Sequence, residues 1–124
     1  MQFMTIYKPS DINGLESGAP PSEEMMTQMG ALIAEYFEKG VMVATGGLGP
    51  SARGAKVKKA DGKVTVKDGP FTETKELIGG FAIFEVPSMA EAIELSRRFL
   101  DLAGDGEVEV RWMNGPLITP PAKG

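Results

Sequence analysis

The hydrophobic positions of the chain fall into short runs typical of strands and longer stripes typical of helices. A strand is expected where apolar residues cluster over a few positions between turn residues. A helix is expected where they recur every three or four residues behind a serine that caps the first turn. The predicted strands are residues 2–8, 41–44, 78–86 and 107–113, the predicted helices are residues 22–39 and 88–103, and residues 9–21 are expected to form a loop.

A β-hairpin is predicted between the second and third of these strands. Residues 55–59 and 63–67 flank Ala60 and the pair Asp61-Gly62, a strong signal for a two-residue hairpin turn. That register places Val57 opposite Val66.

The hairpin is basic within an acidic protein. An anion or a nucleic acid would be attracted to such a surface. Lysines on edge strands also discourage aggregation between sheets, and no aromatic residues for base stacking are interleaved here, so we favour the protective role. The basic residues are Arg53, Lys56, Lys58, Lys59, Lys63 and Lys67.

The order β-α-β, hairpin, β-α-β is typical of the ferredoxin-like split βαβ sandwich, an α+β fold with two main helices on one face of an antiparallel sheet. In this order residues 2–8 and 78–86 are the central strands, and both carry apolar residues on both faces. Because two helices cover only one face, a homodimer is expected to cover the other. The alternative is a monomer that exposes a few apolar residues. Residues 1–124 are expected to form one domain, with a flexible tail from about residue 117.

Composition and charge narrow the class of function. The formal net charge of −4 argues against broad attraction to nucleic acid or to an anionic membrane. No apolar run approaches the ~20 residues that span a bilayer, and the start lacks the pattern of a signal peptide, so a cytoplasmic location is expected. Histidine and cysteine are both absent, which removes the usual general base, thiol chemistry and the commonest transition-metal ligands. We expect no cofactor and no bound metal.

One glycine-rich segment superficially matches a dinucleotide-binding fingerprint. Gly47-x-Gly49-x-x-Ala52 has the glycine spacing of that motif, but it leads into the predicted hairpin rather than a helix. Pro50 also removes a backbone amide. We therefore interpret the segment as a turn.

The most distinctive stretch is Asp68-Gly69-Pro70-Phe71-Thr72-Glu73-Thr74-Lys75-Glu76. Together with Gly79-Gly80-Phe81, Glu91-Ala92 and Glu107-Val108-Glu109-Val110-Arg111, it resembles the YCII-related family, in the branch known as DGPF-domain proteins. The likeness extends to about Pro116. The resemblance implies a bacterial protein that forms a dimeric α/β barrel, with a pocket between the sheet and the helices near the dimer interface.

The resemblance also bears on catalysis. In the wider family a His–Asp pair is the suggested active site, and the histidine would fall near Met29 of this chain, which has none. Asp68 keeps the acidic position. It would act as an acid or base if burial raised its pKa, whereas the competing interpretation, which we favour, is that it caps the turn.

A second candidate is Arg111, which shares a strand face with Glu109 under the period-two rule. Its guanidinium would point toward the predicted cleft and bind a carboxylate in bidentate fashion. An ion pair with Glu109 or with Asp68 is the structural alternative. Weaker candidates are Tyr7, Glu73, Lys75 and Glu76.

These observations predict a homodimer that binds, or slowly converts, a small organic ligand in a cleft near the dimer interface. Asp68 and Arg111 would be its polar anchors. Whether the protein is an enzyme is left open by the sequence. The alternative is a non-catalytic dimerisation or regulatory module associated with transcription, because the resemblance extends to proteins linked to sigma factors.

Overall fold

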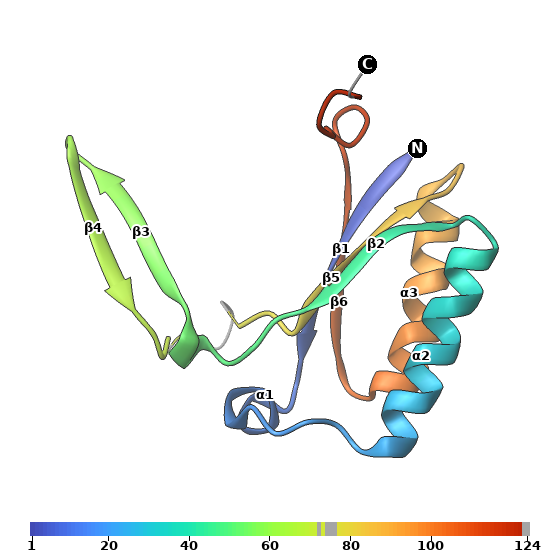
Figure 1. Ribbon diagram of the computed structural model, residues 1–124, viewed down its shortest axis with the longest axis horizontal. Helices are drawn as coiled ribbons and strands as arrows, with labels where there is room; N and C mark the ends of the chain where they lie inside the picture. Colours follow the sequence, from blue (N-terminus) through green and yellow to red (C-terminus); the bar gives the residue numbers. More distant parts are fainter. Residues whose placement is uncertain (72, 74–76, 123–124) are drawn as a thin grey trace.

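A four-stranded antiparallel sheet forms the centre of the molecule, and two long helices lie on one of its faces (Figure 1). The computed structural model describes residues 1–71, 73 and 77–122. The strands of the sheet are β1 (Gln2–Pro9), β2 (Met42–Gly47), β5 (Gly80–Glu85) and β6 (Gly106–Trp112). They follow the order β2-β5-β1-β6. The predicted α+β sandwich, with β1 and β5 at its centre, is confirmed.

The two long helices, α2 (Glu23–Glu38) and α3 (Met89–Ala103), begin at the predicted serine caps. Ser22 Oγ accepts a hydrogen bond from the amide of Met25 at 3.1 Å, and Ser88 Oγ accepts one from the amide of Glu91 at 3.3 Å. Each bond satisfies an amide that has no partner inside the helix. Within the described part of the chain, no helix has the length and hydropathy needed to cross a membrane.

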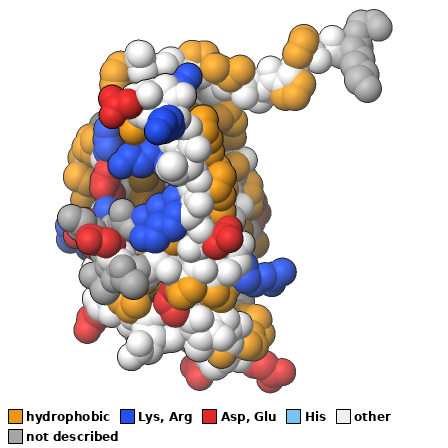
Figure 2. All heavy atoms as spheres, turned by 90° about the vertical axis from the view of Figure 1, so that its left-hand side faces the viewer, with side chains coloured by type: hydrophobic (Ala, Val, Ile, Leu, Met, Phe, Trp, Pro, Cys, Tyr) orange, Lys and Arg blue, Asp and Glu red, His pale blue; other side chains and the backbone are white. Residues whose placement is uncertain are grey.

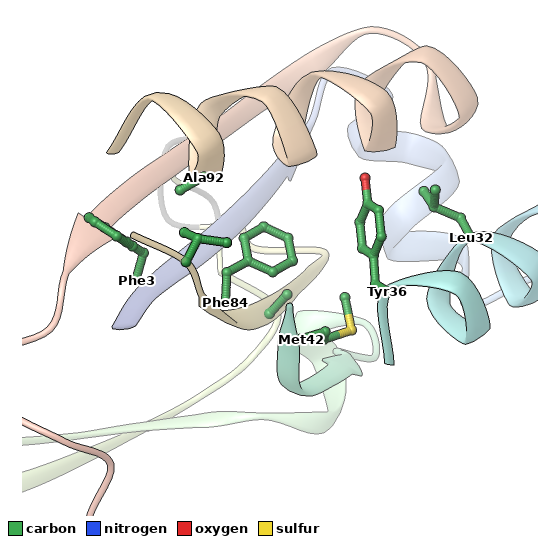
Figure 3. Packing of buried hydrophobic residues seen from close by; sticks show 8 residues of the cluster. Phe3, Leu32, Tyr36, Met42, Phe84 and Ala92 are labelled. Carbon is green, nitrogen blue, oxygen red and sulfur yellow. The ribbon is translucent and has the colours of Figure 1, made fainter. Parts of the chain in front are cut away.

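The main core lies between these helices and the sheet (Figure 3). The Tyr36 ring of α2 meets Phe84 of β5 edge to face, with ring centroids 5.8 Å apart. Its hydroxyl donates a hydrogen bond to the Leu95 carbonyl of α3 at 2.8 Å. Tyr36 therefore joins both helices and the sheet through a single side chain. The other labelled members of the core are Phe3, Leu32, Met42 and Ala92.

The opposite face of the sheet is covered by neither long helix. Phe3 and Thr5 of β1 point toward the helices and are buried, so Met4 and Ile6 lie on the other face. They pair with residues of β5 on that same face, where Ile83 is 7% exposed and Phe81 is partly exposed. We call Met4, Ile6, Phe81 and Ile83 the uncovered sheet face.

A short helix, α1 (Ile12–Ser17), corrects the prediction that residues 9–21 form only a loop. The side chain of Asp11 accepts a hydrogen bond from the Gly14 amide at 2.8 Å, and Gly18 ends the helix with a positive φ of 71°. A helix of six residues is too short to show a periodic apolar stripe, so the pattern of hydrophobic positions did not predict α1.

The predicted hairpin forms a separate two-stranded sheet of β3 (Ala55–Ala60) and β4 (Lys63–Asp68) that projects from the body (Figure 1). Val57 pairs with Val66 as expected. The turn is closed by Asp61 and Gly62, both with positive φ, the geometry that a two-residue hairpin turn requires. We call residues 55–68 the hairpin arm.

A network of hydrogen bonds ties the base of the arm to the body. The short 3₁₀ helix η1 (Ser51–Arg53) lies against the turn that follows the arm. Ser51 Oγ accepts a hydrogen bond from the Phe71 amide at 2.9 Å and donates one to the carboxylate of Glu16 in α1. A Cβ on Gly69 would lie 1.7 Å from the Ser51 carbonyl oxygen, so only glycine fits at this position. The Asp68–Glu76 motif thus has a packing role at its glycine.

Candidate functional site

A cavity of about 630 Å³ lies between the helices and the helix-facing side of the sheet. Met25, Met29 and Ile33 contribute its α2 wall, and Phe99 contributes from α3. Exposed lining residues, Pro21, Met26, Gly30 and Gly47 among them, place its opening beside the N-terminal half of α2. Part of the apolar stripe predicted for this helix therefore faces a cavity instead of filling a core.

Small residues on the sheet create the space. Gly47 of β2 pairs with Gly80 of β5, and Thr45 pairs with Ala82, and all four line the cavity. Paired positions share a face of a sheet, so no large side chain rises from these four positions to meet α2. The two glycine pairs in the sequence, at 46–47 and 79–80, are the signal that could have indicated a cavity here.

Most of the polar side chains that line the cavity already have partners. Tyr36 donates to the Leu95 carbonyl, and three further hydroxyls donate to backbone carbonyls at 2.8–3.2 Å. A hydroxyl whose hydrogen bond is satisfied within the protein offers little to a ligand. These three donors are Thr5 to Ala82, Thr45 to Phe81 and Ser96 to Ala92.

Tyr7 is the exception. Its ring meets Phe99 edge to face, and glycines on the neighbouring chain segments leave room for it: a Cβ at Gly79 or Gly106 would lie 3.1 Å or 3.0 Å from the ring. Within the residues that the structure describes, its hydroxyl has no hydrogen-bond partner. Burial raises the pKa of the Tyr7 phenol above its ordinary value of 10.0, so it stays protonated at neutral pH. It can donate a hydrogen bond to a ligand.

No acidic, basic or histidine side chain belongs to the described lining of the cavity. Burial of an unpaired charge is strongly unfavourable, so the cavity suits a neutral molecule. Among the described residues, no group of three His, Cys, Asp or Glu side chains is placed to hold a metal ion.

The sequence-predicted site residues lie in different parts of the molecule. Tyr7 lines the cavity, whereas Asp68 ends the hairpin arm, pairs with Ala55 and is exposed. Glu73 is exposed, and Lys75 and Glu76 lie outside the described residues. Asp68 and Arg111 belong to separate sheets and neither lines the cavity, so their roles as ligand anchors stay predictions.

Arg111 takes part in a surface cluster of charges. Its guanidinium lies 3.0 Å from the carboxylate of Glu109, which also accepts a hydrogen bond from Lys8 at 3.1 Å. The hydrogen bond from Arg111, and then that from Lys8, lowers the pKa of Glu109. The ion pair between Glu109 and Arg111, which was the structural alternative to a ligand site, is thus present. The Arg111 side chain is 71% exposed.

A second cavity, of about 490 Å³, lies at the base of the hairpin arm. Among the described residues, its polar lining consists of Glu16, Ser51 and Arg53. The hydrogen bonds from the hydroxyl and amide of Ser51 lower the pKa of Glu16, which therefore stays ionised while it holds η1 against α1. Sequence reasoning did not single out Glu16 or Ser51, because their association depends on the unpredicted α1.

Comparisons with known proteins assign the family. The YCII-related domain family matches residues 1–111. An uncharacterized protein of Rhizobium meliloti (strain 1021) is 32% identical over 90 residues, which make up 72% of this chain and 73% of that protein. The solved structure of 5-chloro-2-hydroxyhydroquinone dehydrochlorinase from Burkholderia phenoliruptrix, in complex with 2,5-dihydroxybenzoquinone, is similar with a TM-score of 0.43 and 19% identity, over 93% of this chain and 96% of that one. By the extent of the family match, the chain belongs to the YCII-related domain family.

Proposed function

We propose that the cavity binds a small, neutral and mainly apolar organic molecule whose one hydrogen-bonding group faces Tyr7. The observation that carries this proposal is the hydrogen bonding of the polar side chains that line the cavity. Four of the five polar side chains in its described lining donate to backbone carbonyls, and Tyr7 has no partner among the described residues. A ligand that bonds to this hydroxyl satisfies the remaining polar group of the cavity.

The size and the walls of the cavity support the same class of ligand. A volume of about 630 Å³ lies within the range of small-molecule sites, which are mainly apolar and carry a few polar groups that orient the ligand. Four methionines, Met25, Met26, Met29 and Met42, contribute to the lining. Methionine is flexible and polarizable, so it adapts to ligands of different outline and contacts aromatic rings favourably.

Binding accounts for the arrangement better than acid–base catalysis does. Tyr7 and Tyr36 are the titratable residues of the described lining, and burial raises the pKa of both. A phenol that stays protonated at neutral pH is a poor general base. Slow conversion of the ligand would have to use Tyr7 as a proton donor.

The proposal includes a homodimer formed through the uncovered sheet face. Met4 and Ile6 lie on this face in the central strand β1, and neither long helix covers them. Packing against the same face of a second copy would remove them from water around a two-fold axis. This apolar, partly buried face also favours a second candidate function, a dimerisation or regulatory module.

Three matched compounds test the ligand proposal by isothermal titration. In 2-acetylnaphthalene a carbonyl can accept a hydrogen bond, in 2-isopropenylnaphthalene a methylene group of similar shape cannot, and 2-naphthoate is charged. We expect the two neutral compounds to bind and the anion not to bind. Tyr7→Phe should weaken binding of the ketone by roughly 2- to 12-fold, the equivalent of about 0.5–1.5 kcal/mol for one hydrogen bond, and leave the affinity for the alkene unchanged.

Two outcomes would contradict the proposal. Tighter binding of 2-naphthoate than of the ketone would show that a cation supplies the anchor, as the Arg111 hypothesis predicts. Equal affinity of the ketone for the wild type and Tyr7→Phe, with both proteins folded, would remove Tyr7 from the site.

A further inference from the structure

The hairpin arm has one valine face and one lysine face. Residues that pair across the two strands lie on the same face. Val57 pairs with Val66, and Val64 pairs with Lys59, so three valines share one face. The opposite face carries the lysines Lys56, Lys58, Lys63 and Lys67.

The valine face is open to solvent in the single chain. Val57, Val64 and Val66 are 72%, 62% and 64% exposed. An isolated two-stranded hairpin is marginally stable in water, and three β-branched apolar residues on its surface add an unfavourable exposed area. The arm therefore carries a surface suited to packing against another molecule.

Position and charge indicate what that molecule is. The arm projects on the side of the sheet opposite α2 and α3, the side of the uncovered sheet face (Figure 1). Seen from this side, Lys and Arg side chains gather beside hydrophobic ones over a hollowed surface (Figure 2). A molecule seated on the uncovered sheet face would thus lie within reach of the arm.

The charges of the chain are complementary to those of its own arm. Residues 55–68 hold five lysines and two aspartates, a formal charge of +3. The chain as a whole carries −4, so the rest of it carries −7. The body of a second copy is therefore an acidic partner for a basic arm.

We propose that the hairpin arm clasps a second copy of this chain, packing its valine face, on which Lys59 also lies, on the acidic body of the partner. The inference rests on the proposed homodimer and adds to it a second contact, distinct from the sheet. Because the contact is reciprocal under two-fold symmetry, each dimer would hold two arms. The arm would be an assembly element, which gives a reason for a hairpin that shares no ladder with the main sheet.

The first test measures the dimer dissociation constant by sedimentation equilibrium. The variant Val64→Asn/Val66→Asn makes the valine face polar, and Thr65→Asn is the matched control, since Thr65 lies between them on the lysine face. We expect the dimer dissociation constant of the double variant to be roughly tenfold higher than that of the wild type, a loss typical of an energetically important contact residue. The dissociation constant of the control should match that of the wild type. Added salt should weaken the wild type, because opposite charges are screened.

The second test locates the arm. The chain has no cysteine, so Val66→Cys labelled with benzophenone maleimide gives a single photo-cross-linking site. In a mixture of ¹⁴N- and ¹⁵N-labelled protein, we expect cross-links that join light and heavy chains, from the arm of one to the body of the other. Cross-links within one chain alone would overturn the clasp.

The outcomes separate the clasp from the dimer itself. A monomeric wild type would refute both. A dimer whose dissociation constant is the same for Val64→Asn/Val66→Asn and for the wild type would refute the clasp and leave the sheet interface standing. Saturable binding of duplex DNA by the wild type, abolished by Lys58→Glu/Lys63→Glu while the dimer is unaffected, would assign the arm to nucleic acid instead.

Discussion

The ring of Tyr7 meets that of Phe99 edge to face, with centroids 4.9 Å apart and planes at 80°. This contact joins the central strand β1 to the second half of α3, at the cavity that both residues line. Edge-to-face pairs of this kind are favourable beyond the area they bury. Tyr7 is therefore held in place before any ligand arrives, which limits the entropy that binding would cost.

The two tyrosines of the chain should titrate late. Burial raises the pKa of Tyr7 and Tyr36 above 10.0. Each phenol is thus neutral in the folded protein at a pH where the unfolded chain has begun to ionise. The free energy of unfolding should be steady below pH 10 and fall as the pH rises through the folded pKa values.

Ultraviolet absorbance of phenolate measures this directly. Tyr7→Phe should remove one titrating group, and the remaining Tyr36 transition should still lie above pH 10. A wild-type transition at or below pH 10 with the fold intact would contradict the burial of both rings.

Gly79 is predicted to be needed for the position of Tyr7. A Cβ there would lie 3.1 Å from both the Tyr7 ring and the Pro9 side chain, so Gly79→Ala must displace one of them. We expect a loss of about 1–3 kcal/mol in the free energy of unfolding, typical of overpacking, and weaker binding of 2-acetylnaphthalene.

Gly30→Ala is the matched control for that experiment. Gly30 also lines the cavity, but a Cβ there meets nothing within 4 Å. Since Gly30 lies inside α2, the substitution should stabilise the protein by roughly 0.5–1 kcal/mol without weakening the binding of 2-acetylnaphthalene. Equal destabilisation by both substitutions in urea denaturation would show that crowding around Tyr7 is not the cause.

The ion pair between Glu35 of α2 and Arg98 of α3 should make stability depend on acid pH. The hydrogen bond from Arg98, and then that from Lys39, lowers the pKa of Glu35 from 4.5 to about 2. A carboxylate with a lowered folded pKa contributes stability above its unfolded pKa and loses it as the pH falls through the folded value.

The wild type should therefore exceed Glu35→Gln in unfolding free energy at neutral pH, and the difference should shrink between pH 4.5 and pH 2. Both residues are substantially exposed, so the difference should be small and reduced by salt. A difference that does not change with pH would exclude the ion pair as its source.

Ser51 should hold the arm to the body. Ser51→Ala removes the acceptor of the Phe71 amide and one donor to Glu16. Leaving such part-buried groups without a partner costs about 1–3 kcal/mol. Chemical denaturation should show that loss, while the affinity for 2-acetylnaphthalene stays unchanged because Ser51 lines the second cavity and not the one between α2 and the sheet. Weaker binding of 2-acetylnaphthalene with an unchanged free energy of unfolding would contradict this division of roles.

The sequence predicted the two central strands from the order of elements along the chain, and it predicted both long helices and the hairpin register from local signals. Serine caps, the Asp61-Gly62 turn and period-two alternation all act within a few residues. The sequence did not predict α1, because this helix, which Asp11 caps at its N-terminus, is too short to show a periodic apolar pattern. The sequence analysis named Tyr7 as a weak candidate and favoured charged residues. It did not predict the cavity, because a cavity formed where large side chains are missing is marked in the sequence only by glycines.

The most direct test of the central claim is the response of the methionine methyl groups to 2-acetylnaphthalene in ¹³C-methyl NMR spectra. The chain has eight methionines, and Met25, Met26, Met29 and Met42 line the cavity. The account predicts saturable shifts in these four signals, with Met1, Met4, Met89 and Met113 unaffected. Shifts centred on Met4, or no saturable shift in any of the four lining residues, would contradict a ligand site between α2 and the sheet.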